Sequence, residues 1–107
     1  MPPQKKPTIT DAEAYALFLL DSIHCGWRAG AINTVEPDEL TNAFGRLELP
    51  EIRRRLAALS RKGLVETPTG YEPGKAYFLK PELEDAWNQW MREQRGFEKI
   101  EEFKTRG

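Results

Sequence analysis

Apolar residues recur at the spacing of an α-helix in several stretches of the chain, and these stretches predict most of its secondary structure. A first helix is expected over 11–25, because Thr10 and Glu13 have the spacing of a capping box, in which each side chain accepts from the backbone N–H of the other residue. A short second helix is expected over 37–44, with Pro37 in the first turn, where proline is tolerated.

The third predicted helix covers 50–62 and is followed by Gly63, a residue type that commonly ends helices. Ile52, Leu56 and Leu59 form a single apolar stripe along this helix. On a helical wheel with about 100° per residue, the opposite side carries arginines separated by alanines. One side is therefore expected to pack on a core while the other faces solvent.

Two short strands are predicted after this helix, over 64–67 and 75–79, and the loop between them contains two prolines and two glycines. The pair is expected to form a hairpin. The run at 31–34 has the composition of one further short strand. This order of elements predicts a mainly helical α+β fold.

A fourth helix, expected to be the longest, begins at Pro81 and continues the helical pattern to Phe103. Its later part carries more apolar surface than a small domain readily covers, so we expect a homodimer in which two such helices pair. The expected dimerisation residues are Trp90, Met91, Phe97, Ile100 and Phe103. Gly96 leaves a second outcome open, in which the chain turns back and the residues after it cover their own domain.

The composition excludes several classes of protein. A length of 107 residues suits one domain and is short for large catalytic scaffolds. The apolar stretches fall short of the ~20 residues that span a bilayer, so a cytoplasmic protein without a membrane partner is expected. One cysteine and one histidine are too few for a disulfide or a structural zinc site. His24 and Cys25 point about 100° apart on a helix, so we expect no catalytic pair, no cofactor and no enzyme activity.

The charge of the chain is unevenly distributed. The formal net charge is −1, which by itself disfavours nucleic acid as a partner. Residues 46–80, however, carry eight basic and four acidic side chains, and the segments on both sides of them are acidic. This basic segment contains the third predicted helix and the hairpin. This segment makes nucleic acid a candidate partner again. The alternative is that the arginines form an ordinary solvent-exposed helix face that binds no partner.

The same segment resembles a known family. Residues 36–40, the turn through Gly45 and the sequence LPEIRRRLAALSRKGLV at 49–65 look like the helix-turn-helix of winged-helix transcription regulators. The order of leucine, two residues, lysine, glycine, leucine and valine before a hairpin is similar to the end of the recognition helix in the MarR and PadR groups of bacterial regulators. The resemblance covers about residues 10–92.

The resemblance implies a winged-helix domain over 10–80, after a proline-rich flexible arm over 1–9 and before a C-terminal dimerisation helix over 81–107. It also implies a homodimeric regulator of transcription, most simply a repressor, that binds double-stranded DNA and is associated with the nucleoid when bound. In these families the third helix enters the major groove and the wing touches phosphate or the minor groove.

The implied DNA contacts fall into four groups. Arg54 is the best candidate for a base contact, because arginine can bind guanine O6 and N7 with two hydrogen bonds. The full set is Arg53, Arg54, Ala58 and Arg61 at the groove, Lys62 and Arg46 nearer to phosphate, Thr69 and Lys75 in the wing, and Lys5 and Lys6 in the arm.

A second interpretation comes from a different class of function. Glu72 stands beside one lysine in the wing, where many DNA-binding wings carry several basic residues. Together with the acidic flanks, this favours a winged-helix module that binds a protein, in a larger assembly or as a phage or mobile-element protein on a host complex. Trp27, Trp87 and Trp90 are expected in the core or at a dimer seam rather than around an effector.

Overall fold

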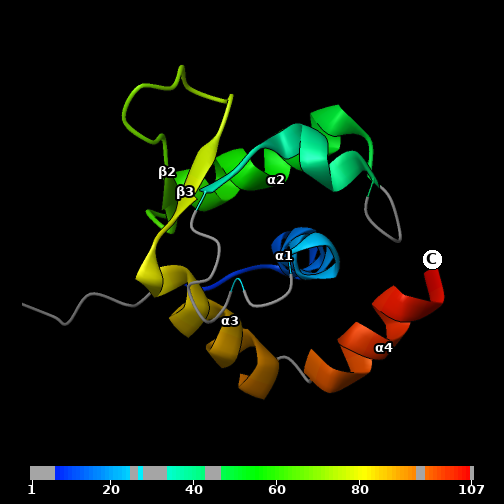
Figure 1. The fold of residues 1–107 in the computed structure, drawn as a ribbon. Helices are drawn as coiled ribbons and strands as arrows, with labels where there is room; N and C mark the ends of the chain where they lie inside the picture. The colour runs from blue at the N-terminus through cyan, green and yellow to red at the C-terminus, as the bar shows by residue number, and fades with distance from the viewer. Residues whose placement is uncertain (1–6, 25–26, 28–33, 43–46, 94–95, 107) are drawn as a thin grey trace, which may run out of the picture.

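The protein is a mainly helical α+β chain with a small antiparallel sheet, as the sequence predicts (Figure 1). The computed structural model describes residues 7–24, 27, 34–42, 47–93 and 96–106. In chain order the elements are the helix α1 (Asp11–Ile23), the strand β1 (Thr34–Val35), the 3-10 helix η2 (Pro37–Asn42), the helix α2 (Leu49–Arg61), the strands β2 (Val65–Glu66) and β3 (Tyr77–Leu79), and the helices α3 (Pro81–Glu93) and α4 (Gly96–Arg106).

The helix α1 lies between α2 on one side and α3 with α4 on the other (Figure 1). Its N-terminus is closed by the predicted capping box: Thr10 N donates to Glu13 Oε1 at 2.8 Å, and Glu13 N donates to Thr10 Oγ1 at 3.1 Å. Because helices pack on several sides of α1, nearly its whole length from Glu13 to Leu20 is buried. The helix therefore forms the centre of the core.

The helix α2 has a buried side and an exposed side, and its end is sharply defined. Ile52, Leu56 and Leu59 are buried, as their spacing predicts. Gly63 follows the helix with a φ of 78°, a left-handed conformation that favours glycine. Leu64 N donates to Leu59 O at 3.0 Å across this turn, which satisfies a carbonyl at the helix end. The chain then enters β2 in a fixed direction.

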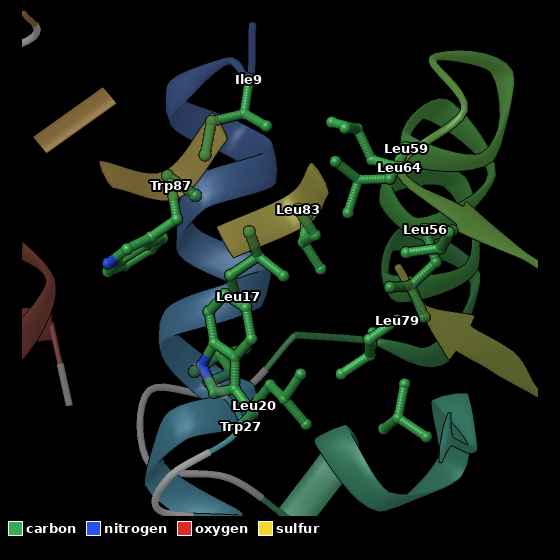
Figure 2. Packing of buried hydrophobic residues seen from close by; sticks show 14 of the residues in the cluster. Ile9, Leu17, Leu20, Trp27, Leu56, Leu59, Leu64, Leu79, Leu83 and Trp87 are labelled. Atoms are coloured by element: carbon green, nitrogen blue, oxygen red, sulfur yellow. The ribbon is translucent and has the colours of Figure 1, made fainter. Parts of the chain in front are cut away.

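The sheet has the order β1-β3-β2, with β3 in the centre. Val65 pairs with Leu79 across the hairpin, and Val35 pairs with Tyr77 on the other side of β3. All four of these side chains are buried, whereas Phe78 between them is partly exposed. The sheet therefore places one face on the core. Figure 2 shows side chains from α1, α2, the hairpin and α3 converging on it.

Several predicted boundaries differ from the observed ones. The first helix ends at Ile23 instead of residue 25, and the second is a 3-10 helix that ends at Asn42. The expected strand at 31–34 is observed as Thr34–Val35. The remainders of these predictions, at 25–26, 28–33 and 43–46, lie outside the described residues. No helix in the described part of the chain has the length and apolar character needed to cross a membrane.

The prediction of one long C-terminal helix is wrong. The structure has two helices, α3 and α4, and α4 packs against α1. In a continuous helix Trp90 and Phe103 would lie about 20 Å apart along the axis. In the structure their rings stack with centroids 6.2 Å apart, and Phe103 also contacts the rings of Tyr15 and Phe18. The second expected outcome is therefore the observed one: the residues after Gly96 pack back on the core of their own domain.

Candidate nucleic-acid interface

The outer side of α2 presents three arginines to solvent. Arg53, Arg54 and Arg61 are exposed, and we call these three residues the arginine face. Ala57 and Ala58 lie between them in the sequence and are only partly exposed. The apolar stripe on the opposite side of α2 fixes this orientation, because turning the helix would expose three buried aliphatic side chains.

The guanidinium groups of the arginine face differ in their contacts. Arg54 Nη1 donates to Glu51 Oε2 at 2.6 Å, although 71% of the Arg54 side chain remains exposed. Neither Arg53 nor Arg61 forms an ion pair or side-chain hydrogen bond with the described residues. Two of the three cations are therefore unneutralised in this part of the chain, and the third shares one carboxylate.

Arg55 belongs to the same helix but faces inward. Its Nε donates to Glu51 Oε1 at 3.1 Å, and its Nη1 donates to the carbonyl of Ala12 at 3.0 Å. The guanidinium carbon also lies 5.7 Å from the centroid of the Tyr15 ring, in range of a cation–π interaction. Arg55 thus connects α2 to the first turns of α1 and is not part of the arginine face.

Lys62, which the resemblance places near phosphate, contacts the start of α1 and the residues just before it. Its ammonium donates to Glu13 Oε1 at 2.5 Å and to the carbonyl of Thr8 at 2.9 Å. The Glu13 side chain is only 4% exposed, so Lys62 neutralises a buried carboxylate. On the wheel Lys62 lies toward the packed side of the helix, but a partner 49 residues away cannot be found from spacing. The capping box and this ion pair share one oxygen.

The loop between β2 and β3 lies next to α2 in the chain and is held by tight turns. Tyr71 N donates to Pro68 O at 3.2 Å, and Gly70 has a φ of 91°. Thr69 and Lys75 are exposed, as a DNA contact requires. Tyr71, a third residue of this loop that could bind phosphate, is 47% exposed. The loop therefore presents an aromatic side chain as well as charge.

Several predicted site residues cannot be placed. Arg46, Lys5 and Lys6 lie outside the described residues, as does the side chain of Phe97. Two of the expected dimerisation residues have a clear location: Trp90 and Phe103 are 2% and 3% exposed in the single chain. Met91 and Ile100 are partly buried and pack on the same core. Trp90 and Phe103 therefore cannot meet a second copy without leaving their present contacts.

The three tryptophans pack together in the core. Trp87 contacts Trp27 and Trp90 with ring centroids 5.8 Å and 5.4 Å away. Trp90 Nε1 also donates to Asp11 Oδ1 at 3.0 Å, which ties α3 to the start of α1. Core packing, the first of the two roles expected for these residues, thus accounts for their positions. Among the described residues, no three His, Cys, Asp or Glu side chains are grouped as metal ligands would be.

Charge is separated between the two sides of the molecule. The helix α2 carries four arginines and one glutamate, whereas α3 carries four acidic residues and one arginine. The acidic side chains of α3, Glu82, Glu84, Asp85 and Glu93, are exposed. Since α1 separates the two helices (Figure 1), a polyanion would be attracted to the α2 side and repelled from the α3 side.

Comparison with known proteins does not identify a relative: no family model, no curated protein and no solved structure matches the chain.

Proposed function

We propose that this protein is a winged-helix DNA-binding regulator of transcription, in which α2 enters the major groove of double-stranded DNA. The observation that carries the proposal is the arginine face, with three exposed guanidinium groups around small alanines on a helix whose other side is fixed in the core. A groove about 12 Å wide admits such a helix, and arginine can contact both phosphate and the guanine edge.

The arrangement of the elements supports the winged-helix part of the proposal. The helix α2 is followed directly by the β2–β3 hairpin, and the third strand, β1, precedes η2 and α2 in the chain. In the proposed assignment, η2 and α2 form the helix-turn-helix and the loop between β2 and β3 forms the wing. Thr69 and Lys75 would contact the DNA backbone beside the helix.

A firmly anchored recognition helix also favours binding. Arg55 donates to the carbonyl of Ala12 in α1. Lys62, at the end of α2, pairs with Glu13 of α1 and donates to the carbonyl of Thr8 just before it. The arginine face is therefore held in position before it meets a partner, and little ordering of the backbone is needed on binding.

Homodimerisation is a separate part of the proposal. Two copies would place two α2 helices on half-sites about 34 Å apart, and this would raise both affinity and specificity. With Trp90 and Phe103 used inside one chain, the surface for a second copy would centre on the partly exposed Met91 and Ile100.

The direct test is fluorescence polarisation with labelled random-sequence duplex DNA at low salt. Replacing Arg53 and Arg61 together by alanine should weaken binding by about tenfold or more, and the salt dependence should become less steep. Arg92→Glu changes the charge on the exposed side of α3 by the same two units and serves as the matched control, with almost unchanged binding expected. A parent protein that does not bind duplex even at low salt would overturn the proposal.

One observation favours the second candidate function, a module that binds another protein. The β2–β3 loop exposes Tyr71 next to Glu72, and Glu66 is exposed at the base of the hairpin. Aromatic side chains are enriched in protein interfaces, and the acidic groups beside Tyr71 would repel a phosphate backbone. Absence of DNA binding in the polarisation assay would leave this candidate as the better one.

A further inference from the structure

Glu51 lies between two arginines of α2, and each of its carboxylate oxygens accepts from a different one. Arg54 Nη1 donates to Oε2 at 2.6 Å, and Arg55 Nε donates to Oε1 at 3.1 Å. The exposed fraction of the side chains rises from 18% for Arg55 through 31% for Glu51 to 71% for Arg54. The carboxylate thus bridges an inner guanidinium and an outer one.

The inner guanidinium fixes the carboxylate in place. Arg55 is held by the Ala12 carbonyl and lies over the Tyr15 ring, and both of these groups belong to α1. Glu51 is therefore not a freely rotating surface carboxylate. The contact with Arg55 holds the Glu51 carboxylate at a fixed place relative to α1. Its Oε2 atom can therefore hold the Arg54 guanidinium in one orientation.

This hold leaves Arg54 with donors to spare. An arginine has five N–H donors, and the Glu51 contact uses one edge of the guanidinium. The remaining donors can meet a second acceptor without release of the first. Arg53 and Arg61 have no such support among the described residues, so their flexible cations suit phosphate, which is present at every step of a duplex.

We propose that Glu51 is a positioning residue that orients Arg54 toward the guanine edge in the major groove, and so makes binding depend on base sequence. The inference rests on the proposed function of α2. The negative charge of Glu51 lowers affinity for phosphate in every duplex, whereas its hold on Arg54 benefits only duplexes with guanine at the matching position. Glu51 thus lowers the affinity for DNA in general and raises the preference for duplexes with guanine at that position.

The test compares selections from one pool of randomised duplexes, carried out with the parent, Glu51→Gln and Glu48→Gln. Glu48 is the matched control, because it is exposed at the N-terminal end of the same helix and its side chain makes no capping hydrogen bond. Both variants lose one negative charge. We expect Glu48→Gln to enrich the same guanine-containing motif as the parent, and Glu51→Gln to lose about fivefold in preference for guanine at one position.

Two further variants show whether Glu51 acts through Arg54. Arg54→Lys keeps the charge and leaves the Arg55 contacts alone, yet lysine cannot contact guanine as a fork, so the same preference should fall. In an Arg54→Ala background, adding Glu51→Gln should cause no further loss of preference. This pattern would separate positioning from a general effect on folding.

The outcomes are distinguishable. A parent that binds no duplex overturns the proposed function and this inference together. A parent that binds all duplexes equally overturns the inference alone. The inference is also overturned if Glu51→Gln or Arg54→Lys retains the parent's guanine preference. It is overturned as well if Glu51→Gln lowers the guanine preference in the Arg54→Ala background as much as it does in the parent.

Discussion

The basic residues of α2 and its C-terminal end lie close together in the sequence, but their side chains make different contacts. Arg53, Arg54 and Arg61 face solvent, whereas Arg55 and Lys62 bind groups of α1. The helical wheel places Arg54 and Arg61 opposite the apolar stripe and Arg53 at one flank, and all three are exposed. It places Arg55 and Lys62 at the other flank, nearer the packed side. It could not reveal that Lys62 meets Glu13, because that contact depends on how α1 and α2 cross.

The Lys62 contact leads to a prediction about stability. Lys62→Met should lower the free energy of unfolding by about 2–3 kcal/mol, because it leaves the buried Glu13 carboxylate without its cation. Urea unfolding measures the change. Lys75→Met removes an exposed cation and should change stability by less than about 0.5 kcal/mol.

A double variant separates this contact from a loss of packing. Glu13→Gln combined with Lys62→Met should be more stable than the sum of the single changes predicts, because Glu13→Gln removes the buried charge that Lys62→Met leaves unpaired. Equal stability of Lys62→Met and Lys75→Met would contradict the assigned role of Lys62.

Among the secondary-structure elements, the ends of helices are the features that the sequence predicts best. The capping box at Thr10 and the glycine after α2 have local hydrogen bonds that depend only on nearby residues, and both are observed. The sequence left the packing of the residues after Gly96 open, because apolar residues at helical spacing do not reveal whether they cover their own domain or another chain. Only the packing of Phe103 on α1 decides it.

The glycine after α2 gives a second prediction. Gly63→Ala should destabilise the protein by about 1–2 kcal/mol, because φ is 78° and an L residue with a Cβ is strained there. Apart from Gly63 and its two chain neighbours, no described atom lies within 4 Å of the position a Cβ would occupy, so the loss comes from backbone conformation. Thermal unfolding is the measurement. Gly63→Asn should lose less, since asparagine tolerates this region, and an alanine variant as stable as the parent would contradict the cap.

The packing of α4 on α1 gives a third prediction. Phe103→Ala should lower stability by about 3–4 kcal/mol, because the ring is buried against Tyr15, Phe18 and Trp90 in one chain. The loss should be the same at low and high protein concentration in chemical unfolding. If the loss of stability depends on protein concentration, and sedimentation shows that Phe103→Ala dissociates a dimer, Phe103 belongs to a subunit interface instead.

The whole molecule separates charge although its net charge is close to zero. Basic groups are concentrated on α2, and exposed acidic groups on α3 lie on the far side of α1. The sequence located the basic segment, but only the fold shows that the acidic helix does not lie beside it. Near-neutral net charge is therefore compatible with a polyanionic partner on one side, and we expect modest affinity for random DNA.

The central claim is that the outer side of α2 is the DNA-contact surface, and backbone NMR of the labelled protein titrated with duplex DNA tests it most directly. We predict that amide resonances of α2 and of the β2–β3 loop shift progressively, while those on the exposed side of α3 remain almost unchanged. Shifts concentrated on α3 and α4, or none at low salt, would contradict the claim.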